Sequence, residues 1–456
     1  MARRRHDMTL RPGLLLVLGL VGVILTGGLL LSLPFAAAGN GAIAPLDALF
    51  TSTSAACVTG LITRDTAVDF SPAGQAVILL LIQIGGLGVM SASGLISLLL
   101  GRGLGVREAG LVRDLFDTRL RSAAGGMLRR IVELTLAIEV LGAVLLHLAA
   151  ADRIPDPGAR AWWSLFHSVS AFCNAGFSLE SDSLISVAGD AGVMGVISAL
   201  LILGGLGFAV IINTTAWLRG RALRRTRRGR VRPVRLGVQA RVIWRLTGLL
   251  LLGGMALLLL LERQGALAGA PWGERLALAW FQSATCRTAG FNSMDLTALG
   301  PASLLVMMVL MAVGAAPGST AGGLKLTTVA ILYANLRSIV LGSEAAVLFD
   351  REVPRLAVRR AFMVLTSWLL AVTLGLGVLL AVDAGPFAPV LFEVISALGT
   401  VGLSLGLTPT LPAAGKVMVI LLMFLGRLGP LAVAYGLVRS RRGVSVRYPE
   451  TDIMVG

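Results

Sequence analysis

Long apolar runs alternate along the chain with shorter apolar stretches that end near a glycine. Runs such as 13–33 and 361–382 hold about 20 residues, which is enough for a helix to cross a hydrocarbon core of roughly 30 Å. Each quarter of the chain therefore predicts a helix, a short re-entrant segment and a second helix. The expected crossings are 13–33, 74–100, 131–151, 191–218, 243–262, 302–341, 361–382 and 416–438, and the short segments are 47–56, 162–172, 275–285 and 388–398.

A short motif that ends in glycine and a large apolar residue follows each short segment. The motif glycines are separated by 116, 114 and 112 residues, and each short segment contains a phenylalanine near its start. A repeat in register predicts four modules of one architecture. We expect an all-α integral membrane protein in which modules 1–122, 123–236, 237–350 and 351–456 surround one central pore in a pseudo-fourfold arrangement, with eight transmembrane helices. The glycines are Gly60, Gly176, Gly290 and Gly402, and the phenylalanines are Phe50, Phe166, Phe281 and Phe392.

Composition places the chain in the lipid bilayer. Hydrophobic residues make up 56% of the 456 residues, charged residues make up 14%, and the mean hydropathy is +0.84. These values exclude a water-soluble enzyme with a single anchor. The arginines at 3–5 precede an apolar run and imitate a signal peptide, but that run is longer than the 7–15 or so residues of a signal sequence. We therefore expect a retained first helix.

The net charge of +16 comes almost entirely from arginines that gather in short blocks between apolar runs. Nucleic-acid binding would need this charge on a soluble face, so no nucleic-acid partner is expected. The blocks lie before the first helix, between the modules and after the last helix, whereas the other loops carry few cations. The positive-inside rule predicts a multi-pass protein of the cytoplasmic membrane with both termini in the cytoplasm, and the short segments then enter from outside.

The four glycine motifs have the chemistry of an ion path. Non-helical backbone at membrane depth is tolerated only where protein or a water-filled cavity covers it, and four turns that meet on one axis cover one another. Rings of backbone carbonyls can replace the hydration shell of a monovalent cation, and the C-terminal ends of the short helices favour positive charge. The expected filter, which holds the ion by backbone carbonyls, comprises Val58, Thr59, Gly60, Asn174, Ala175, Gly176, Thr288, Ala289, Gly290, Thr400, Val401 and Gly402.

These motifs, together with the stretch 314–325, resemble the superfamily of potassium transporters that includes KtrB, TrkH and the plant HKT proteins. The resemblance covers essentially the whole chain and is greatest to KtrB, since no additional helix pair precedes the first module. It implies K+ uptake through a selective pore, with Na+ dependence left open and no organic cofactor. In this family a serine at the first filter glycine accompanies sodium transport, so Gly60 favours potassium. The resemblance also implies a homodimer on a cytoplasmic ring of nucleotide-binding, KtrA-like subunits of the RCK type.

Beneath the filter the resemblance implies a gate made of a mobile intramembrane loop and an arginine. A proline and four glycines interrupt the second helix of the third module and cannot continue a regular helix. Arg427 lies in the middle of an apolar run, where a charge is expensive and indicates function. The family has an arginine at this place that points into the pore. The expected gate comprises Gly314, Ala315, Ala316, Pro317, Gly318, Ser319, Thr320, Ala321, Gly322, Gly323, Lys325 and Arg427, and Lys325 is expected to find a carboxylate or carbonyl partner.

Arg287 and Glu393 are expected to support the filter from behind. A bare cation beside the path would repel potassium, so Arg287 is expected to point away from the axis. Glu393 is its expected partner by analogy with the family. The cysteines at 57, 173 and 286 precede the hairpin turns, and we interpret them as small buried residues rather than as a metal site.

Other functions remain open beside potassium uptake. A TrkH-like or sodium-conducting HKT-like cation transporter fits the same repeats. A secondary transporter of another substrate would show inverted repeats and ionisable residues at the midplane, whereas these repeats share one orientation. A membrane enzyme would need a cluster of nucleophile, metal ligands or acid–base groups. His6, His147 and His167 lie far apart, so no enzymatic activity is expected.

Overall fold

The computed structural model describes residues 12–39, 41–100, 118–226 and 235–429. These residues are mainly helical, as predicted, because only a helix satisfies all its backbone groups within one segment in lipid. The eight expected crossings correspond to α1 (Pro12–Leu31), α3 (Pro72–Leu100), α5 (Thr118–Ala149), the pair α7 (Ala191–Leu206) and α8 (Phe208–Thr226), α9 (Val238–Leu261), the pair α11 (Pro301–Ala312) and α12 (Leu326–Val340), α13 (Arg355–Ala381) and α15 (Ala413–Leu428). The part of the last expected crossing at 430–438 lies outside the described residues.

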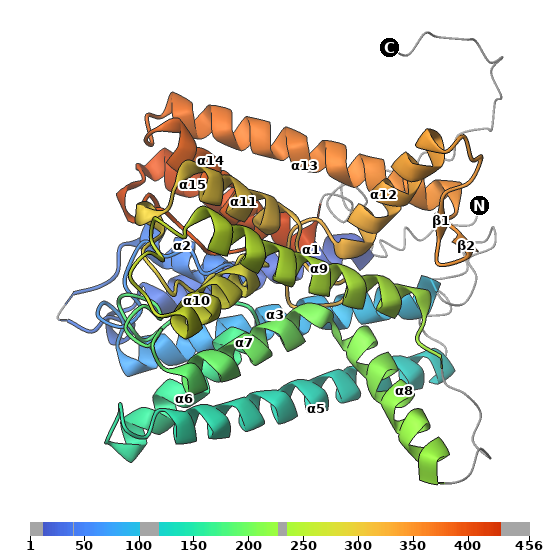
Figure 1. Cartoon of the computed structure of the whole chain (residues 1–456). Coiled ribbons are helices and arrows are strands. Elements are labelled where there is room, and N and C mark those ends of the chain that lie inside the picture. Colours follow the sequence, from blue (N-terminus) through green and yellow to red (C-terminus); the bar gives the residue numbers. More distant parts are fainter. Residues whose placement is uncertain (1–11, 40, 101–117, 227–234, 430–456) are drawn as a thin grey trace, which may run out of the picture.

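The four short segments are also helices, and none is long enough to span a bilayer. They have 12, 16, 14 and 13 residues. A proline is the first residue of two of these helices and the N-cap residue of the other two. At the start of a helix the N–H that proline lacks has no partner within the helix in any case. All four lie in the left half of Figure 1. They are α2 (Pro45–Ala56), α6 (Pro157–Phe172), α10 (Trp272–Thr285) and α14 (Phe387–Gly399).

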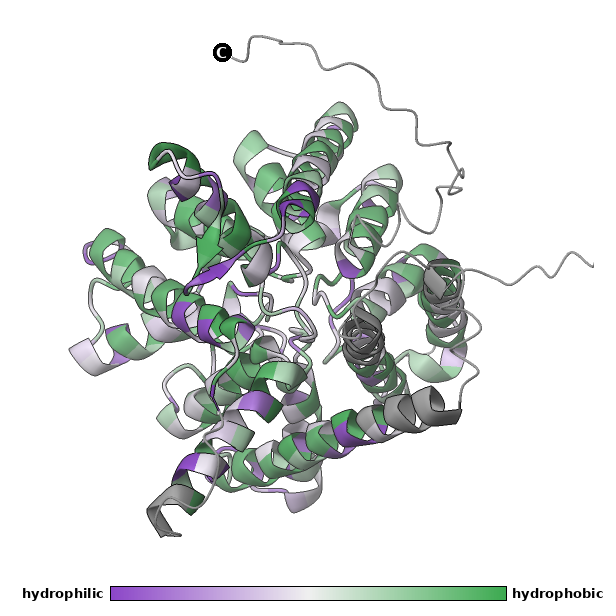
Figure 2. Ribbon diagram, turned by 90° about the vertical axis from the view of Figure 1, so that its right-hand side faces the viewer, coloured by the Kyte–Doolittle hydropathy of each residue, from purple (hydrophilic) through white to green (hydrophobic). Residues whose placement is uncertain are grey.

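Some of the helices are long and apolar enough by themselves to support the assignment to a membrane. Among the described residues, Leu128–Ala149, Val238–Leu261 and Arg355–Ala381 are each long and apolar enough to cross a membrane, and the bent pair α7–α8 is a further candidate. Most of the other crossings contain shorter apolar helices. Seen end-on, the helices surround a central region of irregular backbone, and their outer faces are largely hydrophobic (Figure 2). Leucines such as Leu29, Leu249 and Leu370 are more than half exposed there, as lipid-facing residues are expected to be.

The crossing that the sequence predicts at 191–218 as one continuous helix is wrong in detail. Helices α7 and α8 meet at Gly207 and enclose a bend of 101°. Gly207 has φ of 77°, a left-handed conformation that glycine adopts without strain. The break in 302–341 is observed where it is expected, because α11 ends at Ala312 and α12 begins at Leu326.

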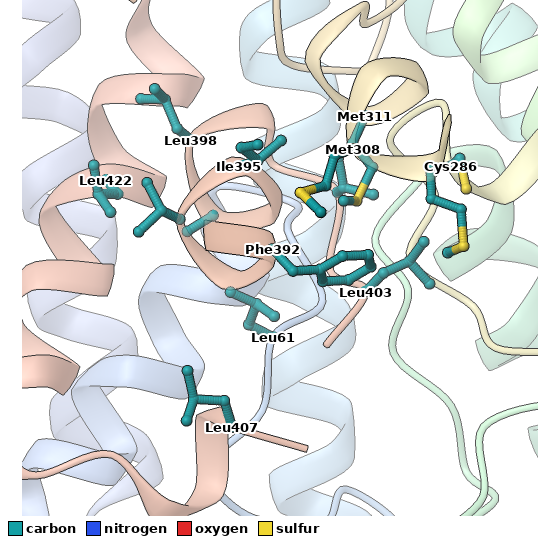
Figure 3. Packing of buried hydrophobic residues seen from close by; sticks show 14 of the residues in the cluster. Leu61, Cys286, Met308, Met311, Phe392, Ile395, Leu398, Leu403, Leu407 and Leu422 are labelled. Carbon is teal, nitrogen blue, oxygen red and sulfur yellow. The ribbon is translucent and has the colours of Figure 1, made fainter. Parts of the chain in front are cut away.

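The phenylalanines of the repeat are buried core residues. Figure 3 shows Phe392 of α14 beside Met308 of α11 and Leu403, which follows the fourth hairpin. The four equivalent phenylalanines are fully buried, so each short helix is anchored at the same point of its length. They are Phe50, Phe166, Phe281 and Phe392.

A small antiparallel hairpin departs from the all-helical expectation. Strand β1 (Val347–Leu348) pairs with β2 (Arg351–Glu352), between α12 and α13. The two turn residues, Phe349 and Asp350, both have positive φ, as a tight two-residue hairpin turn requires. The hairpin lies in the right half of Figure 1, at the opposite end of the molecule from the four short helices.

Candidate ion pathway

The four motif glycines meet around one axis. A Cβ atom added to any of them would lie within 2.8 Å of a carbonyl oxygen in the next hairpin, so each contact needs a glycine. The contacts run from the first hairpin to the second, third and fourth and then back to the first, which closes a ring. The pairs are Gly60 with Ala175, Gly176 with Ala289, Gly290 with Val401, and Gly402 with Thr59.

The backbone of the four hairpins follows one unusual conformation. A non-glycine residue with positive φ stands two positions before each motif glycine, which itself has a φ between 72° and 97°. Alternation of left- and right-handed conformations curls a short backbone so that its polar groups converge. Left-handed non-glycine residues cost free energy and gather at functional sites. The residues with this conformation are Val58, Asn174, Thr288 and Thr400.

Each hairpin is held from behind by the last turn of its short helix. The amide before each motif glycine donates to a backbone carbonyl of that turn, at 2.7 to 2.9 Å. The hydroxyl groups of Ser54 and Ser396 accept the amides of Gly60 and Gly402 at 3.0 and 3.1 Å. Each hairpin is therefore anchored through its amides to its own short helix. The amide pairs are Thr59 with Ser54, Ala175 with Ser170, Ala289 with Thr285, and Val401 with Ser396.

Polar groups at the ring suit a dehydrated cation. The hydroxyl oxygens of Thr59, Thr288 and Thr400 are buried and have no hydrogen-bond partner among the described residues. An unpartnered buried hydroxyl costs about 1–3 kcal/mol. Hydroxyl and carbonyl oxygens are the ligands that hard cations prefer, so this donor set fits a monovalent cation as the transported substrate.

A polar vestibule leads to the ring from the end of the molecule that carries the short helices. A cavity of about 260 Å³ is lined by all four motif glycines and by the carboxylates of Asp65, Glu180 and Asp182. Carboxylates in a concave surface raise the local concentration of cations. The vestibule can therefore deliver cations to the ring and disfavour anions.

The broken helix of the third quarter lies directly beneath the ring. Thr320 Oγ1 accepts a hydrogen bond from Asn174 Nδ2 at 2.8 Å and donates to the carbonyl of Phe172 at 3.2 Å. A Cβ atom added to Gly322 would clash with the side chain of Thr400. The stretch 314–323 thus packs against both the second and the fourth hairpins.

Arg427 fastens this loop to two other helices. Its guanidinium on α15 donates to the carbonyl of Thr320 and, at 2.8 Å, to the carbonyl of Gly85 on α3. Its side chain is buried, and no carboxylate pairs with it among the described residues. A guanidinium is therefore held by two backbone carbonyls below the ring.

The loop also docks on the bend between α7 and α8. The amide of Ala316 donates to Gly205 at 3.1 Å, and the amide of Phe208 donates to Gly318 at 3.4 Å. Lys325 donates to the carbonyls of Ala321 and Gly322, so the prediction of a carbonyl partner is confirmed. These contacts explain the bend, because the start of α8 turns aside at the place that the loop occupies.

The expected pairing of Arg287 with Glu393 is wrong. Arg287 Nη2 donates to Thr247 Oγ1 of α9 at 3.4 Å, behind the third hairpin. Glu393 accepts hydrogen bonds from Ser404 at 2.7 Å and from Thr408. Each group has hydroxyl partners of its own near its own hairpin, and a buried ion pair would desolvate two charges to little gain.

A second repeated motif is absent from the predictions made from the sequence. The second helix of the first, second and fourth quarters carries 85–88, 204–207 and 426–429, which share glycines at the first and last positions. The first glycine packs on a carbonyl near the end of the short helix in each case. Arg427 therefore stands where the other two copies have Gly86 and Gly205. Comparison of these second helices would have identified the arginine from the repeat itself.

Glu139 is a further buried group near the second hairpin. It lies on α5 and accepts a hydrogen bond from Gln83 Nε2 at 3.0 Å. Cys173, beside the second hairpin, contacts the same carboxyl group at 3.6 Å. The cysteines at 57, 173 and 286 are buried and free, as predicted.

Comparison with known proteins agrees with this geometry. A family model described as "TrkH: Cation transport protein" matches residues 22–440. Potassium/sodium uptake protein NtpJ of Enterococcus hirae is 37% identical to this chain, and the match covers 100% of this chain and 99% of that relative. Ktr system potassium uptake protein B of Bacillus subtilis is 35% identical, over 98% of this chain and 97% of the relative.

A solved structure shares the fold at low sequence identity. The crystal structure of the potassium transporter TrkH from Vibrio parahaemolyticus matches with a TM-score of 0.72 at 21% identity, over 96% of this chain and 87% of that chain. The family model covers most of the present chain, and the relatives cover nearly all of it. The chain therefore belongs to the TrkH family of cation transport proteins, and it is a transporter rather than an enzyme.

Proposed function

We propose that this protein takes up potassium across the cell membrane, as the ion-conducting subunit of a Ktr-like system. The closed ring of four glycine hairpins is the observation that carries the proposal. The names of two full-length relatives, which describe potassium uptake and potassium/sodium uptake, support it. Rings of backbone carbonyls are the established means of replacing the water shell of K+.

The proposed transport is a sequence of physical steps. A hydrated cation enters the acidic vestibule and loses water among the carbonyls of the filter, which are the twelve residues expected from the sequence. It then meets the gate, formed by the loop 314–323 with Lys325 and Arg427. Movement of this loop away from the hairpins opens the path, and loops of small residues can re-pair their backbone groups when they move.

The proposed modules follow the repeat. Their boundaries are those expected from the sequence, with modules 1–122, 123–236, 237–350 and 351–456. We propose that the short helices enter from outside the cell and that both termini lie in the cytoplasm. The arginine blocks at 3–5 and 439–447 support this orientation by their charge, although both lie outside the described residues.

The proposed assembly is a homodimer with one pore per subunit, on a cytoplasmic ring of nucleotide-binding, KtrA-like regulatory subunits of the RCK type. It rests on the resemblance to KtrB. The tail 448–456, which the resemblance places near the dimer interface, lies outside the described residues.

Sodium is the specific competitor to potassium as the transported ion. The name of the relative from Enterococcus hirae includes both ions, which favours Na+ as a co-substrate or an alternative. The four glycines of the ring favour potassium, because no side chain narrows it.

Uptake of Rb+ in cells that lack their own potassium uptake tests the proposal. The protein is expected to restore growth at low K+ and to accumulate Rb+, with K+ competing far better than Na+. A series of Na+ concentrations then separates dependence on Na+ from transport of Na+. Uptake of Na+ with no effect of K+ would overturn the proposal.

A further inference from the structure

A second cavity lies at the end of the molecule opposite to the vestibule. It has a volume of about 560 Å³ and is lined by residues of α9, the last turns of α12 and the hairpin β1–β2. Figure 1 shows the end of α12 and this hairpin side by side. Its polar lining includes Arg245, Tyr333, Arg337, Ser338 and Asp350. None of these residues belongs to the ion pathway described above.

The cavity carries a positive charge that the protein fixes in place. The guanidinium of Arg245 lies 4.4 Å from the ring centroid of Phe349, and that of Arg241 lies 5.0 Å from it. Two arginines on one aromatic ring gain from cation–π attraction but repel each other. Phe349 is itself held in a left-handed conformation at the hairpin turn, with φ of 47°.

The arginines of the cavity lack anionic partners. Within the described residues, neither Arg245 nor Arg337 forms an ion pair, although Asp350 lines the same cavity. The Nε atom of the neighbouring Arg241 is buried and has no hydrogen-bond acceptor. Two guanidinium groups facing one cavity can bind a phosphate in bidentate fashion.

The rim of the cavity is strongly apolar. Ile339, Val340 and Leu341 at the end of α12 are 68%, 76% and 66% exposed, and Leu341 also lines the cavity. Tyr333, which lines the cavity, is 64% exposed. Tyrosine and tryptophan are enriched at the membrane–water interface. A soluble phosphate would not use this apolar surface, whereas an amphiphile would cover it.

We propose that this cavity binds one anionic phospholipid of the leaflet at this end of the protein. Its phosphate lies between Arg245 and Arg337, and its acyl chains follow the exposed apolar face of α12. Helix α12 begins directly after Lys325, at the end of the loop beneath the filter. A lipid bound at the far end of α12 therefore steadies the helix to which that loop is attached.

The test uses the full chain, purified in a neutral detergent, with Arg245→Gln/Arg337→Gln as the variant. Arg359→Gln/Arg360→Gln is the matched control, because both arginines are exposed on α13 and do not line the cavity. Binding is titrated with phosphatidylglycerol, with phosphatidylcholine and with soluble glycerol phosphate. The readouts are lipid retained in native mass spectrometry and the thermal unfolding temperature.

Phosphatidylglycerol is expected to bind and to raise the unfolding temperature of the unmodified protein and of the control. The double variant should bind it roughly 30-fold more weakly, since each arginine near an anionic headgroup contributes about 1 kcal/mol. If the double variant fails to fold, Arg337→Gln alone should weaken binding about fivefold. Equal binding by the variant and the control, or equal effects of phosphatidylcholine, would contradict the proposal. Saturation by glycerol phosphate alone would assign the site to a soluble phosphate instead.

Discussion

At the scale of single residues, the ring depends on the absence of side chains at four positions. Gly60 has φ of 94°, and an added Cβ atom would lie 2.5 Å from the carbonyl oxygen of Ala175. Gly60→Ser is therefore expected to push one carbonyl out of the ring. Preference for K+ over Na+ should fall about tenfold, equivalent to about 1.4 kcal/mol, measured as Na+ inhibition of Rb+ uptake into proteoliposomes.

A matched control for this change is Gly88→Ser, because nothing lies within 4 Å of a Cβ atom added there. The control should keep the preference of the unmodified protein. Unchanged selectivity in Gly60→Ser, with normal uptake, would mean that the ring does not select the ion.

Arg427 gives the second residue-scale prediction. Its guanidinium joins the loop at Thr320 to the carbonyl of Gly85, and a charged hydrogen bond contributes about 1.5–3 kcal/mol. Arg427→Ala should raise K+ flux by about tenfold, since it removes both a tether of the loop and a positive charge from the path. Single-channel recording or Rb+ efflux measures this. Arg427→Lys keeps the charge and should give a smaller increase, and a loss of flux in the alanine variant with intact protein would contradict the assignment.

The motif glycines could be predicted from the sequence because their spacing and their conformational freedom are properties of the chain itself. The partner of Arg287 could not. Thr247 lies 40 residues away along the chain, and a hydroxyl partner leaves no periodic signal. The family analogy favoured Glu393, whose own partners are two nearby hydroxyls.

At the scale of elements, the loop 314–323 is held against the second hairpin by one hydroxyl. Thr320→Val removes the group that accepts from Asn174 and donates to Phe172. Loss of both hydrogen bonds is expected to raise the ratio of open to closed states by up to roughly 30-fold, since each contributes about 1 kcal/mol. Single-channel recording measures that ratio.

Thr366→Val is the control for the loop. Its hydroxyl bonds only to the carbonyl of Phe362 within α13 and is exposed. It should leave the open fraction unchanged. An unchanged open fraction in Thr320→Val as well would show that the loop is not held by this contact.

The two helix breaks differ in how well the sequence predicts them. Pro317 and its neighbouring glycines interrupt the third-quarter helix by their own chemistry. The bend at Gly207 depends on a tertiary contact, because the amide of Phe208 bonds to Gly318 in a distant part of the chain. A glycine in an apolar run is common in membrane helices, so periodicity alone gives no reason to break α7 from α8.

At the scale of the whole molecule, an ionic contact joins the first quarter of the chain to the last. Lys416 Nζ lies 2.6 Å from Asp47 Oδ1, and Arg64 Nε lies 3.1 Å from Asp47 Oδ2. Asp47 is buried at the start of α2, while Lys416 belongs to α15. Asp47→Asn should lower the free energy of unfolding by about 2 kcal/mol, the scale of charged hydrogen bonds. Thermal unfolding in detergent measures this, with the exposed Asp152→Asn as control.

The same contact predicts a dependence on pH. Burial raises the pKa of Asp47, but the hydrogen bond and charge of Lys416, together with Arg64, lower it further, so the pKa lies below its usual 3.8. The stability from this carboxylate is therefore complete above pH 3.8 and is lost as the pH falls through the lower folded value. The gap in stability between the unmodified protein and Asp47→Asn should close at low pH. A gap that stays constant with pH would contradict this origin.

The fourfold plan was predictable at this scale because four copies of one pattern imply one arrangement. The ionic contact between the first and last quarters was not, since Asp47 and Lys416 are single charges with no counterparts in the other quarters. The cavity beside the hairpin β1–β2 was missed for the same reason.

The central claim is that the four hairpins surround one dehydrated cation. Crystals or cryo-EM samples of the full chain in Rb+ or Tl+ test it most directly, with Na+ samples as the comparison. The account predicts a density peak on the axis among the carbonyls of residues 58–60, 174–176, 288–290 and 400–402, which weakens when Na+ replaces the heavier ion. Heavy-ion density elsewhere in the protein, with none within this ring in a sample that still transports Rb+, would contradict it.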